Sequence, residues 1–242
     1  YKRQVLVLPK DTDSELEQHL SKQPFMVRSN PRNNDLLIID SHNLSEISNY
    51  IVDSGGFVMD LSSLPSMNSE EIDGILVALR SLCGKEKPFA MLSDISRVNS
   101  LHVRAAYHHA DLVICKIEDG SGISEAASLP LIGRSSKENL SSTDTDSGIV
   151  LGFSADAKDL AVLSATGIKV VCCEVPMVDA MDLALWLKGL SQDLSDILRN
   201  LGLESIDGLS RQNLRALDYE TAAVSGLRLS GYERPLPHWF AR

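Results

Sequence analysis

Residues 57–92 read FVMDLSSLPSMNSEEIDGILVALRSLCGKEKPFAML, and this stretch decides the fold. Two short apolar runs, 57–60 and 89–92, have the length of buried strands. Between them, residues 69–83 repeat apolar side chains at helical spacing, begin with a serine and two glutamates, and stop at Gly84. A strand, a helix and a second strand in this order predict two parallel strands joined by a crossover helix.

The same alternation runs through most of the chain. Its strand candidates are 5–8, 25–28, 36–39, 57–60, 89–92, 112–115, 149–151 and 169–173. Eightfold (β/α) barrels typically take ~250 residues, yet the strands and helices end by about residue 201, and the link 28–36 is too short for a helix. We therefore predict a compact or incomplete TIM-type (β/α) barrel with a C-terminal helical tail. An open doubly wound sheet is the alternative.

The chain is expected to form one α/β domain over residues 1–201, of which 1–59 is the divergent part. Residues 202–242 are expected to form a tail that packs on the barrel or on a partner. The segment 133–148, GRSSKENLSSTDTDSG, has almost no apolar side chains. Because such a segment buries little surface, we expect a flexible loop there.

Composition narrows the functional classes. The chain has 33 acidic and 23 basic residues, a net charge of −10, which opposes general binding to nucleic acid or anionic membranes. No apolar run approaches the ~20 residues of a membrane span. Cys115, Cys172 and Cys173 lie in apolar runs, as reduced core thiols do. We expect a cytoplasmic protein.

Three passages carry a family resemblance. They are DLSSLPSMNSEEI (60–72), ADLVICKIEDGSGIS (110–124) and LGLESIDGLSRQNLRAL (201–217), the last followed by SGLRLSGY (225–232). In order and spacing they resemble the FMN-binding barrel of glutamate synthase, over roughly residues 60–239. The resemblance implies a barrel fold and a flavin-dependent oxidoreductase that acts on 2-oxoglutarate, glutamate or a related amino acid.

The resemblance also implies where FMN would bind. Such barrels hold the phosphate on backbone N–H groups of glycine-rich loops near the last strands. The matching cofactor-binding candidates in this chain are Gly120, Ser121, Gly122, Gly152 and Ser154. A plain turn and a helix N-cap are the alternative interpretations of these two loops.

Several positions depart from the family pattern. At the loop after the seventh strand, Phe153 intrudes and Asp156 would face a phosphate unfavourably. Leu92 stands where active members carry a lysine. Cys172 and Cys173 are adjacent and point to opposite faces of a strand, so they cannot supply the thiolates of an iron–sulfur cluster. FMN binding is therefore left open, and neither an iron–sulfur cluster nor another metal is expected.

Candidate catalytic residues come from strand ends. His42 follows Asp40 at the carboxyl end of one strand, and Asp60 ends the next, where barrels place active groups. A surface cap is the alternative interpretation of His42. These three residues would serve a small-molecule binding or lyase-type barrel.

The family resemblance leaves two further functions open. The first is a divergent glutamate synthase-related protein without redox chemistry of its own, acting as a structural or regulatory subunit. The second is an active FMN-dependent oxidoreductase. In either case we expect a homo- or hetero-oligomer, with a catalytic paralogue as one candidate partner.

Overall fold

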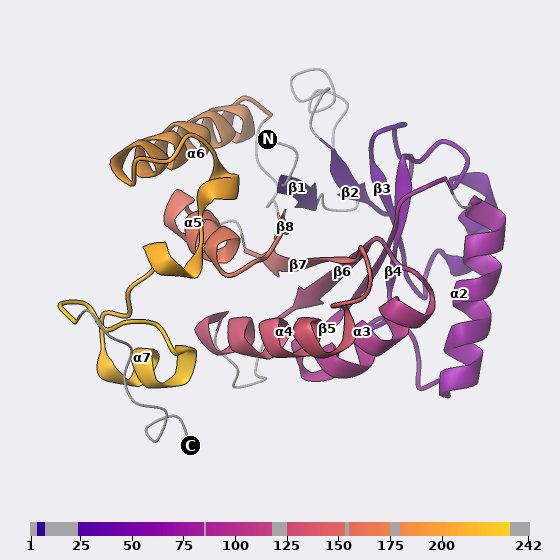
Figure 1. The fold of residues 1–242 in the computed structure, drawn as a ribbon. Coiled ribbons are helices and arrows are strands. Elements are labelled where there is room, and N and C mark those ends of the chain that lie inside the picture. The colour runs from indigo at the N-terminus through magenta and orange to yellow at the C-terminus, as the bar shows by residue number, and fades with distance from the viewer. Residues whose placement is uncertain are drawn as a thin grey trace.

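Eight parallel strands form a closed barrel in the computed structural model, which describes residues 4–7, 24–84, 86–117, 125–152, 155–174 and 180–232 (Figure 1). The strands are β1 (Gln4–Val7), β2 (Phe25–Val27), β3 (Leu36–Ile39), β4 (Gly56–Asp60), β5 (Phe89–Asp94), β6 (Leu112–Lys116), β7 (Asp146–Leu151) and β8 (Val170–Glu174). Each strand pairs with the next, and β1 pairs with β8. The predicted TIM-type barrel is confirmed.

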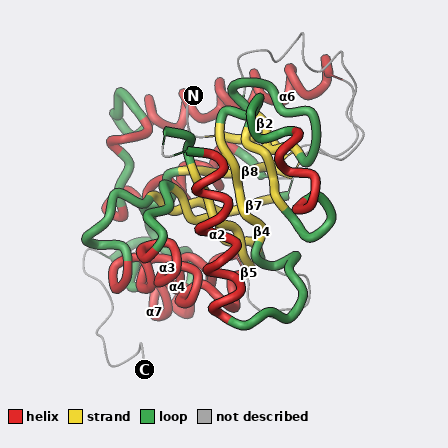
Figure 2. The backbone as a smooth tube through the Cα atoms, turned by 90° about the vertical axis from the view of Figure 1, so that its right-hand side faces the viewer, coloured by secondary structure: helices red, strands yellow, loops and turns green. Residues whose placement is uncertain are grey.

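The layer of helices around the strands is uneven. The described α-helices of this layer are α2 (Ser69–Cys83), α3 (Val98–Tyr107), α4 (Glu125–Asn139), α5 (Ala157–Ala165) and α6 (Ala180–Asn200). They follow β4 to β8 and surround that part of the barrel (Figure 2). Only a short 3-10 helix, η1 (Leu44–Asn49), joins β3 to β4. In the described links between β2 and β4 the helical layer is therefore thin, while the ring of strands is complete.

The link between β2 and β3 has no helix, as its length predicted. Asp35, the last residue of this link, is buried and stabilises it. Its carboxylate accepts hydrogen bonds from the backbone N–H groups of Phe25 (3.0 Å) and Arg32 (2.9 Å) and from the Arg32 guanidinium. The same guanidinium lies 4.3 Å from the centre of the Phe25 ring. These contacts stabilise a tight turn without helical hydrogen bonds.

Helix α2 begins and ends at strong local signals. Asn68 caps it, accepting from the Glu71 N–H (2.9 Å), and the Glu71 carboxylate accepts in return from the Asn68 N–H (2.9 Å). Gly84, at φ 77°, ends the helix. Inside the helix, Leu76 and Leu79 are buried against the barrel. The predicted strand–helix–strand unit is thus confirmed.

Apolar side chains fill two separate regions of the barrel. The interior layer contains Met26, Ile38, Val58, Ala90, Leu92, Ile114, Val150 and Cys172. The larger core lies between strands and helices, where the rings of Phe57 and Phe89 stack with centres 4.7 Å apart. Cys172 belongs to the interior and Cys173 to the outer core, as strand alternation predicted. All four cysteines are free thiols.

The prediction of a flexible loop at 133–148 is wrong for most of that segment. Residues up to Asn139 continue α4, and β7 begins at Asp146. Ile132 and Leu140 are buried against the barrel, while Arg134 and Lys137 face outward. The polar composition therefore belongs to the outer face of an amphipathic helix.

The described part of the C-terminal tail packs on the barrel. It contains η3 (Ile206–Gly208), η4 (Arg211–Asn213) and α7 (Tyr219–Ser225). Contacts join η3 to α5 and α7 to α4. Across the described ranges, no helix has both the length and the apolar character needed to cross a membrane.

A buried histidine links α3 to α4. The His102 side chain is fully buried, and its Nδ1 lies 2.8 Å from Ser135 Oγ. Its Nε2 has no hydrogen-bond partner among the described residues. Burial lowers the pKa of His102 to about 4, because a charged imidazole there would lose its hydration.

His102 therefore makes stability depend on pH. The folded state binds fewer protons than the unfolded state between pH 4 and the ordinary value of 6.5, so stability falls as pH drops through this window. The full effect is about 3 kcal/mol. We expect His102→Asn to flatten the dependence in urea unfolding. The control is His109→Asn at an exposed position with φ 52°, which asparagine tolerates; equal slopes in the two variants would contradict this role.

Candidate functional site

The carboxyl ends of the strands carry charged residues on the inward face. Side chains alternate along a strand, so residues two positions beyond the interior apolar layer also point inward. These residues are Arg28, Asp40, Asp60, Asp94, Lys116 and Glu174, called here the mouth ring. Barrel enzymes place their active groups at this end. The mouth ring is therefore the candidate functional site.

Asp40 is the most enclosed member that has described partners. Its Oδ2 accepts from Arg28 Nε (3.0 Å), and its Oδ1 accepts from the backbone N–H groups of His42 (2.8 Å) and Asn43 (3.2 Å). Burial alone would raise the pKa of Asp40, but the hydrogen bonds from His42, Arg28 and Asn43 outweigh it and lower the pKa. Asp40 is thus a fixed anion that organises the turn after β3.

Asp60, on the neighbouring strand, is held more loosely. Its Oδ1 accepts from the Ser62 N–H (3.0 Å) and the Ser62 hydroxyl (2.6 Å). Ser63 links the two strand ends, because its hydroxyl accepts from the Ser41 N–H (3.3 Å). Asp60 remains partly exposed and can contact a ligand at the mouth.

Lys116 and Glu174 form the other side of the mouth ring. Lys116 Nζ lies 3.4 Å from Glu174 Oε1, and the two side chains are 45% and 51% exposed. They meet across β7, where Gly152 follows the strand and presents no side chain. Such an exposed pair is worth little in stability, so both charges are available to a ligand.

The three predicted catalytic residues differ in how they are placed in the structure. Asp40 and Asp60 lie at the same end of adjacent strands, whereas His42 is exposed and its described contact to Asp40 is through its backbone N–H. Their catalytic roles stay predictions. Sequence reasoning missed Arg28, Asp94, Lys116 and Glu174. The missed signal was a charge two positions after the last inward apolar residue in six of the eight strands, β2 to β6 and β8.

The structure describes one of the five predicted cofactor-binding residues. Gly120, Ser121, Gly122 and Ser154 lie outside the described residues, and Gly152 lies in the mouth between Lys116 and Glu174.

The N-terminus of α5 tests the fit of a flavin phosphate. Asp156 caps this helix, and its Oδ1 accepts from the N–H groups of Lys158 (2.7 Å) and Asp159 (3.0 Å). Asp159 Oδ2 accepts from the Asp156 N–H (2.9 Å). The helix cap predicted as the alternative is therefore present. Carboxylates occupy the N–H groups that a phosphate needs, so the described residues do not fit an FMN phosphate here.

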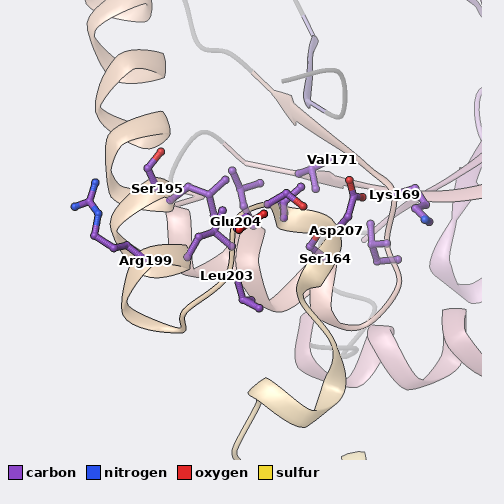
Figure 3. A pocket seen from close by; sticks show the side chains of 14 residues that line it. Ser164, Lys169, Val171, Ser195, Arg199, Leu203, Glu204 and Asp207 are labelled. Atoms are coloured by element: carbon purple, nitrogen blue, oxygen red, sulfur yellow. The ribbon is translucent and has the colours of Figure 1, made fainter.

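Two cavities of about 720 Å³ lie outside the strand ring. The first lies between α5 and α6, with Arg199 and Lys169 at opposite edges and Val171 of β8 at its wall (Figure 3). The second lies between α4 and α5, on the outer face of β7 and beside the tail. Neither is part of the mouth ring.

Comparison with known proteins supports the fold and no finer identity. No family model matches the chain, and no curated protein matches it. Among solved structures, a mandelate oxidase variant has a TM-score of 0.57 at 12% identity, covering 83% of this chain and 76% of that one. A putative deoxyribose-phosphate aldolase from Toxoplasma gondii ME49 has a TM-score of 0.52 at 10% identity, with coverages of 80% and 92%.

A mutant tryptophan synthase α-subunit from Pyrococcus furiosus is also similar, with a TM-score of 0.51 at 12% identity and coverages of 83% and 98%. At such identities the likeness concerns the fold alone. The chain is a TIM-barrel protein, a fold that it shares with oxidases and aldolases.

Asp40 should be a stabilising residue as well as a mouth residue. In Asp40→Asn, an amide facing Arg28 would replace one acceptor and leave the guanidinium unpaired. We expect a loss of about 2 kcal/mol in the free energy of unfolding at pH 7. The matched control is Asp60→Asn on the next strand, whose only described partner is Ser62. Equal losses in the two variants would contradict the assignment.

Proposed function

We propose that this chain is a divergent relative of the glutamate synthase-type FMN barrels that lacks flavin chemistry of its own and acts as a structural or regulatory subunit. The observation that carries the proposal is the N-terminus of α5, where Asp156 and Asp159 occupy the N–H groups that would hold a phosphate. A phosphate dianion would meet two carboxylates there.

Two other positions support the loss of redox function. Leu92, which aligns with the lysine of active members, is buried in the interior layer. Cys172 and Cys173 are buried on opposite sides of β8, and burial raises the pKa of Cys172. A thiol of this kind is a poor source of the thiolate that an iron–sulfur cluster needs.

An oligomeric role is supported by the surface of α6. Met181 and Leu185 are each 60% exposed and lie one helical turn apart, so they share a face. We propose that this face contacts another barrel, a second copy or a catalytic paralogue.

A second candidate function is favoured by the mouth ring. Its two cations and four carboxylates suit a small polar ligand, and the exposed Lys116 and Glu174 could bind it directly. A small-molecule binding or lyase-type barrel would use these residues together with Asp60.

The absorption spectrum of the purified chain tests the first proposal. We expect no flavin band and no saturable quenching of FMN fluorescence on titration with the protein. A stoichiometric flavin spectrum would instead support an active FMN-dependent oxidoreductase and overturn the proposal.

The role of α5 can be tested separately. In the double variant Asp156→Gly and Asp159→Ala, both carboxylates are removed and the first N–H groups of α5 become available, while glycine is tolerated at the N-cap. We expect inorganic phosphate to raise the melting temperature of this variant and not that of the wild type. The control is Asp218→Gly, at the cap of α7. If phosphate does not raise the melting temperature of the double variant, the inference that the two carboxylates exclude a phosphate from α5 is wrong.

A further inference from the structure

The cavity beside the tail has the size and lining of a small-molecule site. Its volume is about 720 Å³, within the ~300–1,000 Å³ of ligand pockets. Ile149 and Leu151 of β7 form its floor, and Val162 of α5 and Leu214 of the tail add apolar walls. An apolar body would be buried here.

The charges around this cavity are mostly positive. Arg134 and Lys137 from α4 and Arg211 from η4 oppose a single acid, Asp159. That acid is engaged by the N–H of Asp156 in the α5 cap. The excess of cations is notable in a chain with 33 acidic and 23 basic residues. The cavity between α5 and α6 differs, because its two cations are balanced by Glu204 and Asp207.

The two cations on α4 are available to a ligand. Within the described ranges, neither Arg134 nor Lys137 has an ion-pair or hydrogen-bond partner. They are three residues apart and therefore share a helix face. Arg211 is partly engaged, since its guanidinium donates to the carbonyl oxygen of Ser225.

We propose that this cavity binds an organic monocarboxylate with an apolar tail. The carboxylate lies against Arg134 and Lys137, and the tail lies on Ile149 and Leu151. Two cations on one helix face match the charge of the head group, and the apolar floor matches the tail. This site is separate from the mouth ring and does not depend on the function proposed above.

A substitution at Gly133 can fill the cavity without disturbing the fold. It lines the cavity from the middle of α4, and a Cβ built there meets nothing within 4 Å. A larger side chain therefore projects into open space, and any residue other than proline favours the helix over glycine. Gly133→Phe should fold and fill the cavity. Gly74 in α2 also has open space around its Cβ and lines neither cavity, so Gly74→Phe is the matched control.

Isothermal titration calorimetry of the full chain with decanoate, decanol and decylamine tests the proposal. We expect saturable decanoate binding that weakens with added salt, weaker decanol binding and no decylamine binding. Gly133→Phe should abolish decanoate binding and Gly74→Phe should retain it.

The charge contribution is tested by the double variant Arg134→Gln and Lys137→Gln, which should weaken decanoate binding roughly tenfold. The control Arg199→Gln, at the other cavity, should leave it unchanged. The proposal is overturned if the wild type does not bind decanoate, if decanol or decylamine binds as tightly, or if Gly133→Phe binds as well as the wild type.

Discussion

The pairing of β1 with β8 closes the barrel, and the remaining geometry follows from this closure. Gln4 to Val7 align with Val171 to Glu174, so every strand has hydrogen-bonded neighbours on both sides and no edge is exposed. Closure also fixes which side chains point inward, because alternation along each strand then refers to one interior. A shift of one residue in any strand would exchange its inward and outward sets.

The interior shows how tightly that register is held. Gly56 and Gly148 lie at inward positions near the amino ends of their strands. A Cβ at Gly56 would lie 2.8 Å from the Pro88 carbonyl oxygen, and one at Gly148 would lie 3.0 Å from that of Val170. Close backbone approach therefore excludes a side chain at Gly56 and disfavours one at Gly148. Farther along, apolar residues of the described strands fill the barrel, and the charges of the mouth ring follow at the carboxyl ends.

Charges in the mouth ring are held more firmly where they are more buried. Asp40 is 3% exposed and receives hydrogen bonds from two backbone N–H groups and from Arg28. Lys116 and Glu174, each close to half exposed, have only their long ion pair between described side chains. An enclosed carboxylate without donors would be costly, whereas an exposed pair is supported by water. The charges at the ends of β2 and β3 are thus held by more hydrogen bonds than those at the ends of β6 and β8.

The sequence was sufficient where local signals decide the structure. The strand runs, the ends of α2 and the short link 28–36 depend on neighbouring residues, and all three were predicted correctly. The polar stretch 133–148 misled because a helix that packs through Ile132 and Leu140 needs few apolar residues. Its composition could not show that α4 packs against α3. Arg28, Asp94, Lys116 and Glu174 were missed because they share one end of the barrel only after the strands have paired.

The cap of α5 shows how a helix N-terminus can be satisfied without an anionic ligand. Asp156 stabilises the helix by accepting N–H groups, which is the same interaction that a phosphate would make. A carboxylate at this position therefore completes the helix end without a ligand. The structural requirement and the binding requirement compete for the same N–H groups, and in this chain the structural one occupies them.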